Sequence, residues 1–197
     1  MKMELQSVKY NGLEIGFNNR KEFETLFDEI FLKQIYRFET KNPKPVIFDC
    51  GSHIGLSVLY FKMLYPGASI VAFEPDKKSF KILKKNIEHN KLDDIETYNL
   101  ALSGTKGIIN FYRESSPDWD TCGNSTVEEW GDRNGFYRES IESTVLSDYI
   151  TGEIDFLKMD IEGAELNVLE TIQNKIHLIR ELALEYHVYN AESKNRL

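Results

Sequence analysis

The stretch that decides the fold is residues 46–55, which read Val-Ile-Phe-Asp-Cys-Gly-Ser-His-Ile-Gly. A short apolar run ends at Asp49, two glycines follow, and an apolar helical pattern begins after Gly55. This order predicts a buried strand, a glycine turn and the start of a helix. Because it also places a carboxylate at the mouth of the turn, we expect a ligand that is cationic there.

The glycine spacing separates two classes of nucleotide ligand. Gly51 and Gly55 follow the pattern D-x-G-x-x-x-G, whereas the dinucleotide pattern G-x-G-x-x-G seats a pyrophosphate on a helix N-terminus. His53 stands where that pattern has its second glycine, and we expect it to be a turn residue, with a catalytic base as the alternative. Asp49 would repel a pyrophosphate and attract a sulfonium, which favours S-adenosylmethionine and methyl transfer over a dinucleotide. An ordinary strand-to-helix turn is the remaining alternative.

Strand and helix patterns alternate around this stretch. Helices are expected at 55–65, 77–89 and 163–173, and strands at 46–49, 69–74, 95–100, 154–159 and 181–187. This order predicts an α/β fold with a mostly parallel, doubly wound sheet and helices on both faces. In the strand order 3-2-1-4-5 the first and fourth strands are neighbours.

The whole chain, 1–197, is expected to form a single domain, with a donor-binding core over 46–188. An N-terminal extension, 1–45, contains a hairpin that turns at Asn11-Gly12 and a helix over 21–35. A long polar segment over 113–139 is a candidate lid loop, since it carries two tryptophans; a disordered segment is the equal alternative. The flanking strands, 107–112 and 140–146, are expected to pair.

Two further segments suit a nucleoside. Glu74 closes the second strand, where an acid can accept hydrogen bonds from both ribose hydroxyls. This position supports nucleoside binding but does not separate a methyl donor from NAD. The chain near Ala101 and Leu102 offers an apolar slot and backbone groups for adenine, with a plain strand exit as the alternative.

A group of polar side chains follows the fourth and fifth strands. Asp160 comes after the fourth strand, so Asp49 and Asp160 would flank one crevice at the carboxyl edge of the sheet. Glu185 and His187 alternate along the fifth strand and share a face. Asp160, Glu185 and His187 are therefore candidates for a catalytic acid/base group or a hard-metal site, with a polar strand end as the alternative. No Cys/His spacing predicts zinc.

The composition limits the partners. A net charge of −8 over 197 residues argues against a nucleic-acid footprint. No run approaches 18 apolar residues and the N-terminus lacks a secretion signal, so no membrane partner is expected. Two cysteines make no disulfide framework, and the expected compartment is cytoplasmic. The remaining partner is a small-molecule acceptor.

Together these residues resemble class I S-adenosylmethionine-dependent methyltransferases, and more narrowly the FkbM family. The similarity covers about residues 29–188, and its most specific part is the run Lys-Met-Asp-Ile-Glu-Gly-Ala-Glu at 158–165. The other matching segments are 48–55, 73–75, 99–103, 145–150 and 184–187.

The resemblance implies a Rossmann-like methyltransferase fold and usually an O-methyltransferase that acts on a sugar or secondary metabolite. It implies that Asp160 lies between donor and acceptor. The donor-binding positions would be Asp49, Gly51, Ser52, Gly55, Glu74, Ala101, Leu102 and Asp160.

That fold normally continues after the fifth strand with a helix and two more strands, which ten residues cannot supply. We expect either an incomplete C-terminal end, or strands 107–112 and 140–146 filling out that side of the sheet. Two alternative functions stay open: an NAD-dependent oxidoreductase and a non-catalytic nucleoside-binding module.

Overall fold

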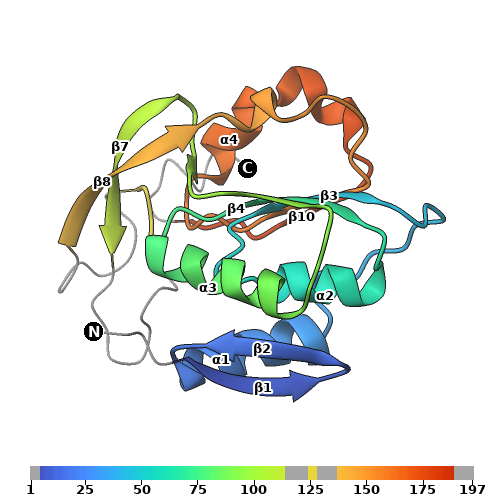
Figure 1. The fold of residues 1–197 in the computed structure, drawn as a ribbon. Coiled ribbons are helices and arrows are strands. Elements are labelled where there is room, and N and C mark those ends of the chain that lie inside the picture. The colour runs from blue at the N-terminus through green and yellow to red at the C-terminus, as the bar shows by residue number, and fades with distance from the viewer. Residues whose placement is uncertain (1–4, 114–123, 128–136, 189–197) are drawn as a thin grey trace.

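The computed structural model describes residues 5–113, 124–127 and 137–188. Its centre is a parallel five-stranded sheet with the strand order β10-β9-β3-β4-β5 (Figure 1). The order confirms the expected arrangement, in which the first and fourth strands of the core are neighbours. The strands are β3 (Val46–Cys50), β4 (Ser69–Phe73), β5 (Ile95–Tyr98), β9 (Phe156–Met159) and β10 (Leu182–Leu184).

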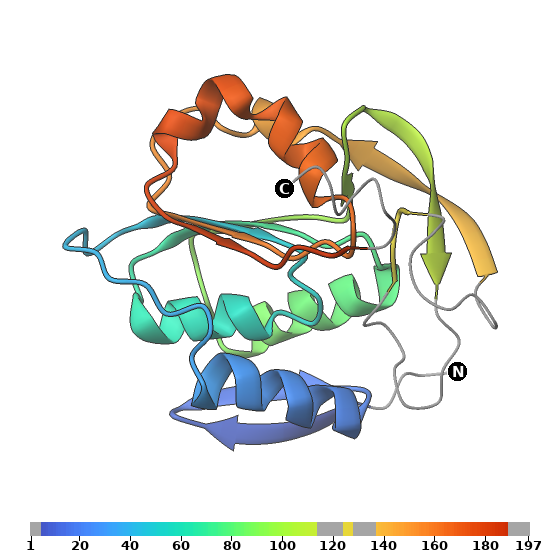
Figure 2. The same ribbon diagram turned by 180° about the vertical axis from the view of Figure 1, so that it is seen from behind.

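Helices cover both faces of this sheet. One face carries α2 (Leu56–Leu64) and α3 (Lys77–His89), and the other carries α4 (Glu165–Thr171) and the 3₁₀ turn η3 (Gln173–Leu178) (Figures 1 and 2). Alternation along β3 explains this layering, because Ile47 packs into the core beneath α2 and Phe48 into the core beneath α4. Each such buried side chain contributes about 1.5–3 kcal/mol of transfer free energy.

The N-terminal extension forms a further layer beneath α2 and α3 (Figure 2). Strands β1 (Gln6–Tyr10) and β2 (Leu13–Phe17) pair around the predicted two-residue turn. Asn86 of α3 fixes this hairpin: its side chain accepts from the amide of Gly16 at 2.7 Å and donates to the carbonyls of Gly16 at 3.0 Å and Ile54 at 2.8 Å.

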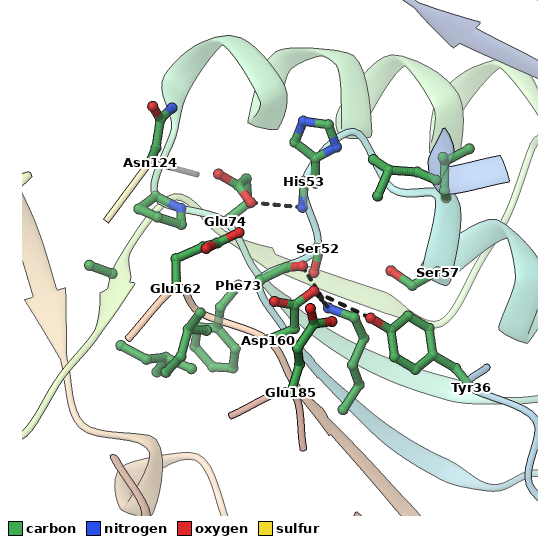
Figure 3. A pocket seen from close by; sticks show the side chains of 18 of the residues that line it. Tyr36, Ser52, His53, Ser57, Phe73, Glu74, Asn124, Asp160, Glu162 and Glu185 are labelled. Atoms are coloured by element: carbon green, nitrogen blue, oxygen red, sulfur yellow. Dashed lines mark hydrogen bonds and ion pairs between the residues drawn. The ribbon is translucent and has the colours of Figure 1, made fainter. Parts of the chain in front are cut away.

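The helix expected over 21–35 is not continuous. Helix α1 (Arg20–Phe27) is followed by a wider π-helical turn, η1 (Asp28–Leu32). Within this wider turn Ile30 and Phe31 are both buried in the core. The chain then turns so that Tyr36 reaches the end of the sheet (Figure 3).

A second sheet corrects two expectations. Strands β6 (Ala101–Leu102), β8 (Tyr137–Thr144) and β7 (Gly107–Arg113) form a separate sheet in the order β6-β8-β7. The idea that 107–112 and 140–146 fill out the main sheet is therefore wrong, although the two strands do pair. The strand expected over 95–100 also divides at Tyr98, because the side chain of Asn99 holds the carbonyls of Glu74 and Pro75 and bends the chain.

The second sheet has its own small core of Ala101, Phe111 and Ile141, while Leu102 of β6 packs with Phe73 in the core beneath α4. The 3₁₀ turn η2 (Leu146–Asp148) leads from it back to β9. Most of the candidate lid, including Trp119 and Trp130, lies outside the described residues. Within the described ranges, no helix has the length and apolar character needed to cross a membrane.

Candidate functional site

A cavity of about 320 Å³ opens at the carboxyl edge of the main sheet (Figure 3). Its walls come from the turn after β3, the ends of β4 and β9, the second sheet, and the α1–η1 segment. The volume is within the usual range for small-molecule sites. The predicted site residues that line the cavity are Gly51, Ser52, Glu74, Ala101, Leu102, Asp160 and Glu185.

The glycine turn is shaped by the protein's own backbone. Gly51 has φ +86°, and a Cβ there would lie 1.8 Å from the carbonyl oxygen of Asp160. Gly55 has φ +90°, and its Cβ would lie 2.6 Å from Leu83 Cδ1. Both positions need glycine because of positive φ and close packing. Gly55 is not among the described residues that line the cavity, so its contact with a donor stays a prediction.

The backbone of the same turn holds Glu74. The amide of His53, a turn residue at φ +49°, donates to Glu74 Oε2 at 2.7 Å, and the amide of Asp76 donates to Oε1 at 2.7 Å. Burial, and then the charge of Asp76, raise the pKa of Glu74 to about 8. Each carboxylate oxygen keeps a second lone pair for a ligand.

Asp49 lies beneath the cavity and not at its mouth. Its side chain is fully buried, accepts from Ser57 Oγ at 2.5 Å, and lies 3.3 Å from Lys158 Nζ. Asp49 is not among the described lining residues, so the expected crevice flanked by Asp49 and Asp160 is corrected: Asp160 alone faces the cavity. A direct contact of Asp49 with a donor stays a prediction.

Sequence reasoning gave no role to Lys158 or Tyr36. Lys158 donates to the carbonyl of Gly51 at 2.8 Å and lies 3.7 Å from Asp160 Oδ2, while the Tyr36 hydroxyl donates to the same Oδ2 at 3.3 Å (Figure 3). Burial lowers the pKa of Lys158, but Asp49, Tyr36 and Asp160 outweigh it and raise that pKa above its usual value. Lys158 could have been noticed as a charged residue inside an otherwise apolar strand. Nothing in the sequence around Tyr36 indicates a role in the site.

Asp160, Glu185 and His187 come together as expected, with ligand atoms within 4.8 Å of one another. His187 Nδ1 lies 2.9 Å from Oε1 of the fully buried Glu165, and Nε2 lies 3.6 Å from Glu162 and 3.7 Å from Glu185. Burial opposes the charge on His187, but the Glu165 hydrogen bond and the Glu162 charge raise its pKa to about 9.

Glu185 is the more exposed carboxylate of this group. Burial and the charge of Asp160 raise the pKa of Glu185. His187 is not among the described residues that line the cavity, so it borders the site through Glu185 and Glu162. Asp160 and Glu185 bring carboxylates to the cavity from the ends of β9 and β10, and Glu74, Phe73 and Leu102 line it from the end of β4 and from β6.

This layout can bind a nucleoside at the carboxyl edge of an open α/β sheet and can move a proton beside it. The chain matches the methyltransferase FkbM domain over residues 49–194 and belongs to this family. It is therefore a methyltransferase, and the expected family and Rossmann-like fold are confirmed. The family gives no support to an NAD-dependent oxidoreductase.

Similar proteins come from fungi and bacteria. Methyltransferase sdnD of Sordaria araneosa is 29% identical over 83% of this chain and 74% of its own length. The 2-O-methyltransferase NoeI of Sinorhizobium fredii is 28% identical over 74% of this chain and 65% of its own length. The 31-O-demethyl-FK506 methyltransferase FkbM of Streptomyces tacrolimicus is 27% identical over 90% of this chain and 79% of its own.

A solved structure has the same fold. The crystal structure of methyltransferase FkbM from Methylobacillus flagellatus superposes with a TM-score of 0.51 at 20% identity. The match covers 74% of this chain and 32% of that one, so this chain corresponds to about a third of the solved protein.

Proposed function

We propose that this chain transfers the methyl group of S-adenosylmethionine to a hydroxyl of a small molecule, such as a sugar or a secondary metabolite. The observation that carries the proposal is that Glu74 and the Asp160–Glu185 pair face one cavity from different strand ends. Two relatives are named as O-methyltransferases acting on defined positions, which supports oxygen as the acceptor atom.

The donor end of the cavity fits an adenosine. Glu74 is held by two backbone amides and keeps lone pairs for the ribose hydroxyls. Phe73, Leu102 and Phe111 supply the apolar surface that an adenine ring needs. The bound donor supplies an activated methyl group, so the protein mainly has to align and desolvate the reacting groups.

The acid end of the cavity fits the sulfonium and the acceptor. Asp160 is kept in place by Tyr36 and Lys158, and its negative charge favours a positive sulfur nearby. Glu185 is more exposed than Asp160 and its pKa is raised, so it is the better proton acceptor for a hydroxyl. His187 lies between Glu165 and Glu185 and orients the latter.

A metal-assisted reaction is the second candidate. The ligand atoms of Asp160, Glu185 and His187 are close enough together for one divalent cation. Loss of turnover in EDTA that Mg²⁺ restores selects the metal site, whereas unchanged turnover selects the metal-free acid/base group. Binding of S-adenosylhomocysteine in EDTA serves as the control for the donor site.

The proposal is tested by transfer of a radiolabelled methyl group to a panel of glycosides and hydroxylated macrolides. We expect product with a methyl ether, and no transfer to matched deoxy compounds that lack the hydroxyl. Donor binding without turnover across the whole panel would instead support the non-catalytic nucleoside-binding module.

A further inference from the structure

The second sheet supplies a wall of the donor end of the cavity. Ala101, Leu102 and Phe111 of this sheet line the cavity beside Glu74. Ser125 pairs with Tyr112 through two backbone hydrogen bonds of 2.7 and 3.0 Å, and its hydroxyl donates to the carbonyl of Glu162. The sheet therefore has to be fixed against the main sheet for this wall to form.

Arg113, the last residue of β7, makes that connection. Its Nε and one terminal nitrogen donate to Glu139 of β8 at 2.8 and 2.7 Å, and its other terminal nitrogen donates to Asp76. The guanidinium also lies 5.6 Å from the centre of the Phe111 ring. The Arg113 side chain is 12% exposed and that of Asp76 is 2% exposed, so solvent screens this ion pair little.

Asp76 lies between Arg113 and the ribose acid. Its Oδ1 caps α3 by accepting from the amides of Lys78 at 2.8 Å and Ser79 at 2.7 Å, and its Oδ2 faces Arg113. Its own amide donates to Glu74 Oε1. Asp76 therefore fixes one oxygen of Glu74 through the backbone, while its carboxylate charge acts on the same group.

We propose that Arg113 is a positioning residue for the donor: it neutralises Asp76 and thereby keeps Glu74 oriented and able to accept hydrogen bonds from the ribose. This inference rests on the proposed function, because it takes the cavity beside Glu74 as the donor site. Arg113 touches neither the donor nor the reacting atoms and acts through Asp76.

Removal of the guanidinium leaves a buried carboxylate without its counter-ion, two residues from Glu74. The charged groups that act on Glu74 are then Asp76 and Lys158, with the amides of Asp76 and His53 as hydrogen-bond donors. An unscreened Asp76 raises the pKa of Glu74 further, and a protonated Glu74 loses one acceptor site. Donor affinity should fall, and its rise with pH should move to higher pH.

The test measures S-adenosylhomocysteine binding by calorimetry between pH 6 and 9 for wild type and four variants. Arg113→Gln is expected to move the pH midpoint up by roughly half a unit or more, which weakens binding at pH 7 by roughly threefold or more. Arg113→Lys keeps the positive charge but cannot donate to Asp76 and Glu139 with the planar geometry of a guanidinium, so it should bind with intermediate affinity. Arg138→Gln makes the same charge change at an exposed position of β8 and should bind like wild type.

Glu139→Gln distinguishes the roles of the two partners of Arg113, because it removes the Glu139 charge and leaves the contact with Asp76 in place. This variant should bind S-adenosylhomocysteine nearly like wild type. An affinity of Arg113→Gln within twofold of wild type overturns the inference. So does equal weakening at every pH, or an equal loss in Glu139→Gln, because either result indicates that Arg113 only stabilises the sheet. No binding by the wild type overturns the proposed function and this inference together.

Discussion

Lys158 Nζ lies 3.3 Å from the fully buried carboxylate of Asp49, directly beneath the glycine turn. The ammonium also donates to the carbonyl of Gly51, so one buried cation links the first and fourth strands of the core to the turn. Lys158 thereby connects the buried Asp49 with Asp160, whose carboxylate lines the cavity and lies 3.7 Å from the same ammonium.

We expect Lys158→Met to cost about 3–5 kcal/mol in the free energy of unfolding, because it leaves Asp49 buried without a counter-ion. Urea denaturation measures this loss. Lys9→Met is the matched control, since Lys9 is 84% exposed and lies 3.9 Å from Glu14, and it should cost less than about 0.5 kcal/mol. Equal costs for the two variants would contradict a stabilising buried pair.

Gly51→Ala should destabilise the fold by at least about 1–3 kcal/mol, because φ is +86° and the new Cβ meets the backbone of Asp160. Binding of S-adenosylhomocysteine should fall with it, as the turn and Asp160 shift apart. Gly152→Ala is the control, since a Cβ there meets no atom within 4 Å. Thermal melts of the two variants give the comparison, and a Gly51→Ala melt equal to that of Gly152→Ala would rule out the close approach.

The pKa of Glu74 predicts how stability depends on pH. Its folded-state pKa of about 8 is raised above the usual value of 4.5, so its contribution is present at low pH and is lost as pH rises from 4.5 to 8. Wild type should lose up to about 1.4 kcal/mol per pH unit across this window through Glu74. Glu74→Gln should lack that slope in urea denaturation at a series of pH values.

Subtraction of the two stability curves isolates the Glu74 contribution. His187 has a pKa of about 9, above its usual value of 6.5, so it adds a loss of stability between pH 6.5 and 9 that is common to both proteins. Parallel curves for wild type and Glu74→Gln would show that Glu74 titrates normally in the folded state.

Glu185→Gln and Asp160→Asn should each lower turnover by about 10²–10⁴-fold while S-adenosylhomocysteine still binds. Glu185→Gln loses the proton acceptor, and Asp160→Asn loses the charge that favours the positive sulfur, which the neutral thioether of S-adenosylhomocysteine lacks. Steady-state methyl transfer and calorimetry measure the two effects separately. Glu181→Gln, at an exposed position before β10, should behave like wild type in both. Equal losses of turnover and donor affinity would remove the catalytic assignment of Asp160 and Glu185.

The spacing of apolar residues predicted the main sheet well, because the apolar residues of each core strand and helix are the ones that the structure buries. The helix expected over 77–89 agrees with α3 to the residue, and Asp76 is its N-cap. The π-helical turn after Phe27 was not predictable, since periodicity assumes one helical repeat. The separate second sheet depends on where strand β5 ends, which a side-chain contact of Asn99 decides.

The site was predictable where residues follow strand ends, as Glu74, Asp160 and Glu185 do. It was not predictable where the contact joins distant segments. Tyr36 and Asp160 are 124 residues apart, and the contact of Arg113 with Asp76 crosses between two sheets. Asp49 was predicted at the strand end, but its environment was not. The sequence does not show that the carboxylate is buried and paired with Lys158.

Calorimetric titration of the wild-type chain with S-adenosylhomocysteine and with NADH tests the central claim most directly, with Glu74→Ala as the companion variant. The account predicts saturable one-to-one binding of S-adenosylhomocysteine and no binding of NADH to the wild type. It also predicts that Glu74→Ala no longer binds S-adenosylhomocysteine. Saturable binding of NADH without a response to S-adenosylhomocysteine, or unchanged binding in Glu74→Ala, would contradict it.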